Sequence, residues 1–203
     1  SRGLGDVYKR QETDYIDLLL IHQAFGDYYG TYRAMQKALE AGKVRAIGLS
    51  NFVDARFVDL VENMEVKPAV LQLETHVFSQ QKRMRELMAP YGTRLMAWAP
   101  LAEGRNGIFT HPTLTVIGAK YGKTAAQTAL RFLMAEDVIA IPKSVHRERL
   151  VENFSIDDFE LSAEDLDAIR ALDGGKPMFA DFNDPTLAKF LLEYDAKFNP
   201  ERQ

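Results

Sequence analysis

The segment that decides the predicted fold is Asp14-Tyr15-Ile16-Asp17-Leu18-Leu19-Leu20-Ile21-His22. Nearly every position of Ile16–Ile21 is apolar, which is typical of a strand covered on both faces, whereas a half-exposed antiparallel strand alternates apolar and polar residues. We therefore expect a parallel strand beneath an outer helical layer. His22 should stand at its carboxyl end.

Four more short apolar runs follow this strand, and helical patterns separate them. The runs are residues 46–49, 69–73, 95–98 and 138–141, and the helical patterns are 32–41, 54–63, 81–89 and 125–135. This alternation predicts parallel βα units. The spacing alone leaves two architectures open, an open doubly wound sheet and part of a barrel.

Helix ends are also readable in the sequence. Thr124 followed by Gln127 is a capping-box pattern, and Ser162 followed by Asp165 is a weaker one. Asp184-Pro185 places a capping side chain before a proline at the first helical position. We therefore expect a helix after each of these caps, the last one near the C-terminus.

Composition excludes several classes of function. The 203 residues are 46% hydrophobic, which suits one sizeable domain, and 25 basic and 29 acidic residues leave a net charge of −4 with no basic stripe. We therefore expect neither nucleic acid nor membrane partners. The absence of cysteine excludes disulfides and suits the cytoplasm, and the four histidines lack metal-ligand spacing.

Taken in order, several stretches resemble the aldo-keto reductases, in particular the bacterial branch similar to diketogluconate reductases. They are residues 14–22, 42–52 (Gly-Lys-Val-Arg-Ala-Ile-Gly-Leu-Ser-Asn-Phe), 141–145 (Ile-Pro-Lys-Ser-Val) and 152–154 (Glu-Asn-Phe). The resemblance implies an incomplete parallel (β/α)8 TIM barrel, with about five of eight βα units and extra C-terminal helices. We expect residues 13–203 to form this partial barrel domain.

The resemblance implies an NADPH-dependent reductase of aldehydes or ketones that acts by direct hydride transfer. His22 matches the histidine that orients the substrate carbonyl; position alone would favour a histidine that bonds to a neighbouring loop, and the surrounding match reverses that preference. Ser50, Asn51 and Gln72 match residues that hold the nicotinamide carboxamide, although Ser50-Asn51 could instead cap the next helix. Trp98 matches the aromatic residue that packs on the nicotinamide ring; a lone tryptophan is otherwise more often core.

Two cations follow the last predicted strand. Lys143 and Arg149 match the family's ligands of the adenosine 2′-phosphate, which favours NADP over NAD, and Asn153 and Glu152 match residues near the adenine. The alternative is a solvated charged face. The remaining residues that we assign to the cofactor site are Pro100, Leu101, Ser144 and Val145.

The family's proton donor is a tyrosine supported by a lysine and an aspartate, and none of the three has a match in residues 13–203. Tyr8, Lys9 and Asp6 have the right chemical types, but they crowd into four residues, so we reject them. Residues 6–11 match the peptide that a transposase end sequence encodes, and we interpret residues 1–12 as a non-native scar. We therefore expect a truncated and catalytically impaired chain.

Two other interpretations remain open. One is a non-catalytic NADP-binding or protein-interaction module derived from the same fold, and the other is an unrelated parallel barrel or doubly wound protein. The first and last strands would be exposed edges, so we expect poor folding, aggregation or pairing with a second copy. Candidates for substrate specificity are Met178, Phe179, Phe182 and Asn183, which could instead pack on the barrel rim.

Overall fold

The computed structural model describes residues 13–198, so the segment that we interpret as a scar lies outside the described residues. Five strands form one sheet in the order β1-β2-β3-β4-β5, and both β1 with β2 and β4 with β5 pair in parallel. Their bounds are β1 Ile16–Ile21, β2 Val44–Ser50, β3 Val70–Glu74, β4 Arg94–Trp98 and β5 Ile139–Ala140. All five predicted strands are therefore present, and the last is shorter than predicted.

The chain divides into two compact units, and each is described by itself. Of the described residues, the first unit comprises 13–71, 87–93 and 181–198, and the second comprises 72–86 and 94–180. The first unit holds α2 Tyr28–Glu40, α3 Ala55–Asn63, η1 Ala89–Tyr91 and α9 Pro185–Phe198. The second holds η2 Ala102–Thr110, α5 Pro112–Lys120, α6 Ala125–Ala135, α7 Arg147–Phe154 and α8 Ala163–Arg170, and α4 Lys82–Met88 runs across the division of the sequence.

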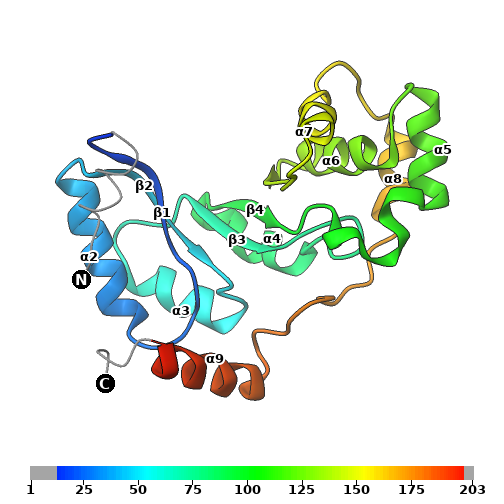
Figure 1. Cartoon of the computed structure of the whole chain (residues 1–203). Coiled ribbons are helices and arrows are strands. Elements are labelled where there is room, and N and C mark those ends of the chain that lie inside the picture. Colours follow the sequence, from blue (N-terminus) through cyan, green and yellow to red (C-terminus); the bar gives the residue numbers. More distant parts are fainter. Residues whose placement is uncertain (1–12, 199–203) are drawn as a thin grey trace. The chain divides into compact units, whose positions relative to one another are not determined.

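In the first unit, α2 packs against β1 and β2 (Figure 1). This helix begins four residues earlier than predicted because the Asp27 carboxylate accepts a hydrogen bond from the Gly30 amide at 2.8 Å and caps the helix. Tyr32 is fully buried, and its hydroxyl donates to the Val66 carbonyl at 3.1 Å. The helical layer thus lies over the strands that precede His22 and Ser50.

Gly48 allows the strands of the first unit to approach closely. A Cβ atom at this position would lie 2.7 Å from the Leu20 side chain and 2.7 Å from the Val70 carbonyl oxygen. No larger residue fits without moving backbone. The glycine therefore contributes to the placement of Ser50 two residues later.

The prediction that β1 is covered on both faces is wrong for the part of the chain that is described. Only Ile21 is buried, and Leu18, Leu19 and Leu20 are half-buried. Within residues 13–198, β1 has β2 as its one partner strand, so its other edge lacks the neighbour that a central parallel strand has.

In the second unit, the capping box of α6 is confirmed. The Thr124 hydroxyl accepts from the Gln127 amide at 3.2 Å, and the Gln127 side chain accepts from the Thr124 amide at 3.1 Å. Ser162 likewise caps α8 through the Asp165 amide at 3.2 Å. Both helices therefore begin where their sequence patterns place them.

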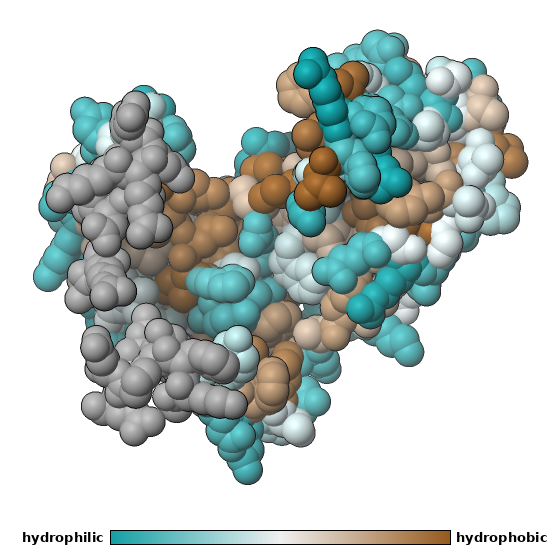
Figure 2. Space-filling model, in the orientation of Figure 1, coloured by the Kyte–Doolittle hydropathy of each residue, from teal (hydrophilic) through white to brown (hydrophobic). Residues whose placement is uncertain are grey.

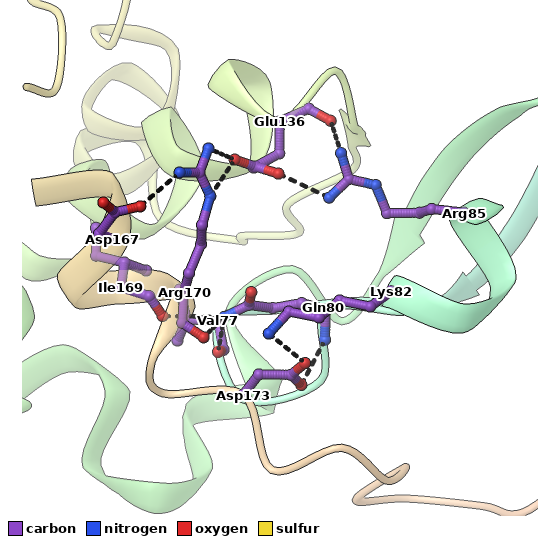
Figure 3. A network of polar contacts seen from close by, with 9 residues as sticks. All are labelled: Val77, Gln80, Lys82, Arg85, Glu136, Asp167, Ile169, Arg170 and Asp173. Carbon is purple, nitrogen blue, oxygen red and sulfur yellow. Dashed lines mark hydrogen bonds and ion pairs between the residues drawn. The ribbon is translucent and has the colours of Figure 1, made fainter. Parts of the chain in front are cut away.

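A polar network ties α8 and the segment after it to the connection between β3 and α4 (Figure 3). The Glu136 carboxylate lies between Arg85 and Arg170, at 2.7 Å and 2.5 Å. The Gln80 side chain donates to the carbonyls of Val77 and Ile169, at 2.8 Å and 2.9 Å. These contacts fix where the chain leaves α8.

Candidate functional site

In the first unit, His22 follows β1 directly and its side chain is exposed. Its carbonyl oxygen accepts a hydrogen bond from the Asn51 side-chain amide at 3.3 Å. This bond joins the segment after β1 to the segment after β2. An exposed imidazole at a strand end can reach a substrate, which is the arrangement that the sequence predicts.

Ser50 ends β2 and is the buried polar residue of this unit that best fits a ligand. Its side chain is 1% exposed, and its hydroxyl oxygen has no hydrogen-bond partner within residues 13–198. Buried hydroxyl groups are nearly always paired, so an orphaned one points to a missing polar group. The alternative that Ser50-Asn51 caps α3 is not what the structure shows, because the cap position belongs to Asp54.

In the second unit, Gln72 and Trp98 lie on neighbouring strands. The Gln72 side-chain amide donates to the Met96 sulfur at 3.3 Å. Trp98 is half-buried, and its ring centroid lies 5.6 Å from that of Phe179 at an angle of 58°. Ser50 and Asn51 belong to the first unit, whereas Gln72 and Trp98 belong to the second. The expectation that all four residues hold one nicotinamide therefore stays a prediction.

The second unit contains a pocket of about 470 Å³ around the segment that joins β5 to α7. Seven predicted cofactor residues line it, together with three residues that the sequence did not indicate. The predicted residues are Leu101, Lys143, Ser144, Val145, Arg149, Glu152 and Asn153, and the others are Phe109, Ala126 and His146. Pro100 is buried and does not line the pocket.

Two positive charges in this pocket are available to a ligand. Lys143 and Arg149 are both exposed, and neither has an ion-pair partner within the described part of the chain. The Ser144 hydroxyl accepts from the His146 amide at 3.1 Å and forms the turn from which α7 begins. A phosphate group fits such a site, with two cations and the first amides of a helix.

Glu152 has a partner that its sequence pattern did not reveal. The Thr124 hydroxyl donates to the Glu152 carboxylate at 2.6 Å, and the Gln127 side chain donates to the Glu152 carbonyl at 3.2 Å. The capping box of α6 therefore also fixes α7 at the pocket. Pairwise contacts between two helices leave no local sequence signal.

Comparison with known proteins agrees with this geometry. A family model described as "Aldo/keto reductase family" matches residues 4–174. The chain belongs to the aldo/keto reductase family. This confirms the resemblance to the aldo-keto reductases that the sequence motifs indicated.

Curated relatives of this aldo/keto reductase include two named for small dicarbonyl substrates. Glyoxal reductase of Bacillus subtilis is 42% identical over 165 residues, which are 81% of this chain and 59% of the relative. Methylglyoxal reductase DkgA of Escherichia coli is 34% identical and is matched over 88% of this chain and 66% of its own length. The chain thus spans about three fifths to two thirds of these relatives.

Solved structures confirm the fold class. An aldo-keto reductase enzyme from a Medee basin deep-sea metagenome library matches with a TM-score of 0.84 and 38% identity, over 89% of this chain and 67% of that one. Aldo-keto reductase AKR2E4 of Bombyx mori, in complex with NADP, matches with a TM-score of 0.80 and 31% identity, over 89% of this chain and 66% of that one. The sheet is not closed into a barrel within residues 13–198, in agreement with the predicted incomplete TIM barrel. None of the helices described is long and apolar enough to cross a membrane.

Proposed function

We propose that this aldo/keto reductase chain carries the NADP-binding part of an NADPH-dependent reductase of aldehydes or ketones. The observation that carries the proposal is the pocket at the start of α7, where Lys143 and Arg149 are exposed and lack ion-pair partners among the described residues. Small dicarbonyl compounds, after which two relatives are named, are the substrates to test first.

The chemistry of the pocket suits the adenosine end of NADP. Arg149 can bind a 2′-phosphate through two N–H groups, and Lys143 adds a second positive charge. The side-chain amide of Asn153 can donate to or accept from an adenine edge. NAD lacks the 2′-phosphate, so these residues favour NADP over NAD.

At the other end of the cofactor, we propose that Ser50, Asn51, Gln72 and Trp98 orient the nicotinamide. NADPH, when bound, supplies the hydride for a carbonyl carbon. His22 would donate a hydrogen bond to the carbonyl oxygen and hold it in position. The hydroxyl of Ser50, which is buried and lacks a partner in the described part of the chain, suits an amide group of the cofactor.

We further propose that the chain by itself turns over slowly. Reduction leaves an alkoxide that must take a proton, and a positioned side chain typically accelerates such a step about 100-fold to 10,000-fold. The residues that match the family site include His22 but not the tyrosine that donates the proton, nor the lysine and aspartate that support it.

The experiment follows the oxidation of NADPH by its absorbance, with methylglyoxal as substrate. We expect very slow turnover by the chain as given, and restored turnover when the chain is joined to the N-terminal segment of a family member. Rapid turnover by the chain alone would refute the impairment. No turnover by the joined protein would refute the reductase assignment.

A second candidate function, a non-catalytic NADP-binding or protein-interaction module, has one observation in its favour. Apolar side chains gather on the surface at α7 and β5 (Figure 2). They include Val145, Val151 and Phe154, which are 77%, 58% and 86% exposed. We propose that this surface, together with the outer edges of β1 and β5, which have no partner strand within residues 13–198, supports self-association. We also propose that the protein acts in the cytoplasm.

A further inference from the structure

The pocket at the start of α7 contains a histidine whose side chain takes no part in capping the helix. His146 occupies the cap position of α7, but its side chain makes no cap hydrogen bond. The Ser144 hydroxyl holds the His146 backbone instead, because it accepts from the His146 amide at 3.1 Å and donates to the His146 carbonyl at 3.3 Å. The imidazole therefore lines the pocket without a role in starting the helix.

The two ring nitrogens of His146 have different surroundings. Nδ1 lies 3.6 Å from the Glu148 carboxylate, and the two side chains are 54% and 77% exposed, so this contact adds little stability. Nε2 has no hydrogen-bond or ion-pair partner within residues 13–198. A neutral imidazole donates from one nitrogen and a protonated one donates from both, so Nε2 is available to a ligand in the pocket.

The balance of charge in this pocket depends on His146. Among the ionisable residues that line the pocket, Lys143 and Arg149 are permanent cations. Glu152 is an anion, and the Thr124 hydroxyl holds its carboxylate at 2.6 Å. Because Glu152 offsets one of the two cations, protonation of His146 doubles the net positive charge that a bound phosphate meets.

The neighbouring elements do not offset that change. Helix α7 packs against α6 (Figure 1), and the residues that line the pocket from α6 and η2 are Ala126 and Phe109, which carry no charge. Arg147 and Glu148, in the first turn of α7, are both exposed, have opposite charges and do not line the pocket. Within the described part of the chain, His146 is thus the lining residue whose charge changes near neutral pH.

We infer that protonated His146 is a third cationic ligand of the 2′-phosphate, and that it makes the preference of this chain for NADP over NAD increase as the pH falls from about 8.5 to about 6.5. The inference rests on the proposed function, in which the pocket binds the 2′-phosphate. NAD has no phosphate at this position, so the charge of His146 leaves its binding unchanged. His146 is thereby a specificity-determining residue for the cofactor.

The direction of the effect follows from the coupling of two binding events. A phosphate group binds better to a protonated imidazole, so the complex holds this proton more tightly than the free protein does. The affinity for NADP therefore rises as protons become more available. The phosphate itself sets the lower limit of the pH range, because its second pKa is about 6 and a phosphate that gains a proton loses charge.

The first test measures the affinities of the full chain for NADP⁺ and NAD⁺ by calorimetry, at about pH 6.5 and at about pH 8.5. The oxidised cofactors are used because NADPH decomposes in acid. A pair of exposed charges changes an affinity by up to about fivefold, and this pH range covers only part of the titration of a histidine. The ratio of the two affinities should therefore increase by about threefold in the wild type as the pH falls.

Three variants separate the charge of His146 from its shape. In His146→Gln the ratio should not increase as the pH falls, and in His146→Lys it should be high at both pH values, because the lysine charge is permanent in this range. His111→Gln replaces another histidine of the second unit, which does not line the pocket, and it should keep the wild-type response. The affinity for NAD⁺ should be the same in all four proteins, which controls for damage to the fold.

The second test measures proton uptake in the same titrations at about pH 7. Binding of NADP⁺ to the wild type should take up protons, so the measured heat should depend on the ionisation heat of the buffer. His146→Gln and His146→Lys should take up fewer protons with NADP⁺, and the uptake with NAD⁺ should be the same in all three proteins. A histidine that only supported the loop would change the affinity without changing the proton uptake.

Two results would overturn the inference. One is the same pH response of the affinity ratio in the wild type and in His146→Gln, and the other is equal proton uptake by these two proteins. If His146→Gln fails to fold, an increase of the ratio in His146→Lys as large as in the wild type would overturn it. A wild type that binds NADP⁺ and NAD⁺ equally at both pH values would instead refute the proposed function.

Discussion

Replacing the two cations of the pocket tests the assignment of the 2′-phosphate. Lys143→Met and Arg149→Met keep the length and apolar character of the side-chain stem and remove the positive charge. A hydrogen bond to a charged group contributes about 1.5 to 3 kcal/mol, and both side chains are exposed, so the lower figure applies. Because 1.4 kcal/mol is a factor of ten, each variant should bind NADPH about tenfold more weakly. The double variant should lose about 100-fold if the two effects add.

The assay is a titration of Trp98 fluorescence with NADPH and, as the matched control, with NADH. NADH lacks the phosphate, so its weaker binding should be the same in the wild type and in the variants. Added salt should weaken NADPH binding to the wild type more than to the double variant, because salt screens exposed charges. Equal losses for both nucleotides, or no loss for NADPH, would refute the assignment.

Three further predictions concern the fold and its surface. Thr124→Ala removes the cap of α6 and the partner of Glu152. In denaturant titrations it should lower the free energy of unfolding by about 1 kcal/mol, whereas Thr124→Ser should retain most of the wild-type stability. A loss as large in Thr124→Ser would contradict the role of the hydroxyl. Burial raises the pKa of Asp165, but hydrogen bonds from Lys120 and Tyr121 outweigh it and hold the pKa below its ordinary value. The unfolded chain therefore binds this proton more readily, so stability should fall as the pH drops below about 4, and Asp165→Asn should flatten that part of the profile in thermal melts. Phe154→Ser should reduce self-association in sedimentation experiments if the surface at α7 carries it, and an unchanged oligomer distribution would exclude that surface.

The strands and most helices could be predicted because their signals are local. The apolar run Ile16–Ile21 and the capping residues Asp184, Thr124 and Ser162 each indicate an element through neighbouring positions. The start of α2 was missed because its cap, Asp27, precedes the apolar pattern by several residues. Helix α5 was also missed, although it begins at Pro112, a favoured residue at a first helical position.

The pocket could be predicted only in part. Lys143 and Arg149 were indicated by their charge and their place after the last predicted strand, and Asn153 by the resemblance to the family; the structure brings all three to one pocket. Phe109 and Ala126 were not indicated, because they reach the pocket from η2 and α6, which are distant in sequence from Lys143. The hydrogen bonds that the Met178 and Phe179 amides donate to the Glu74 carboxylate join residues more than 100 positions apart, and no spacing rule reveals them.

The most direct test of the central claim is the titration of the wild-type chain with NADPH and NADH while the emission of Trp98 is followed. We predict saturable quenching by NADPH, with binding at least about tenfold tighter than that of NADH, because the charged contacts to the 2′-phosphate exist with NADPH alone. Equal affinity for the two nucleotides, or no quenching by either, would contradict the claim that this aldo/keto reductase chain contains an NADP site.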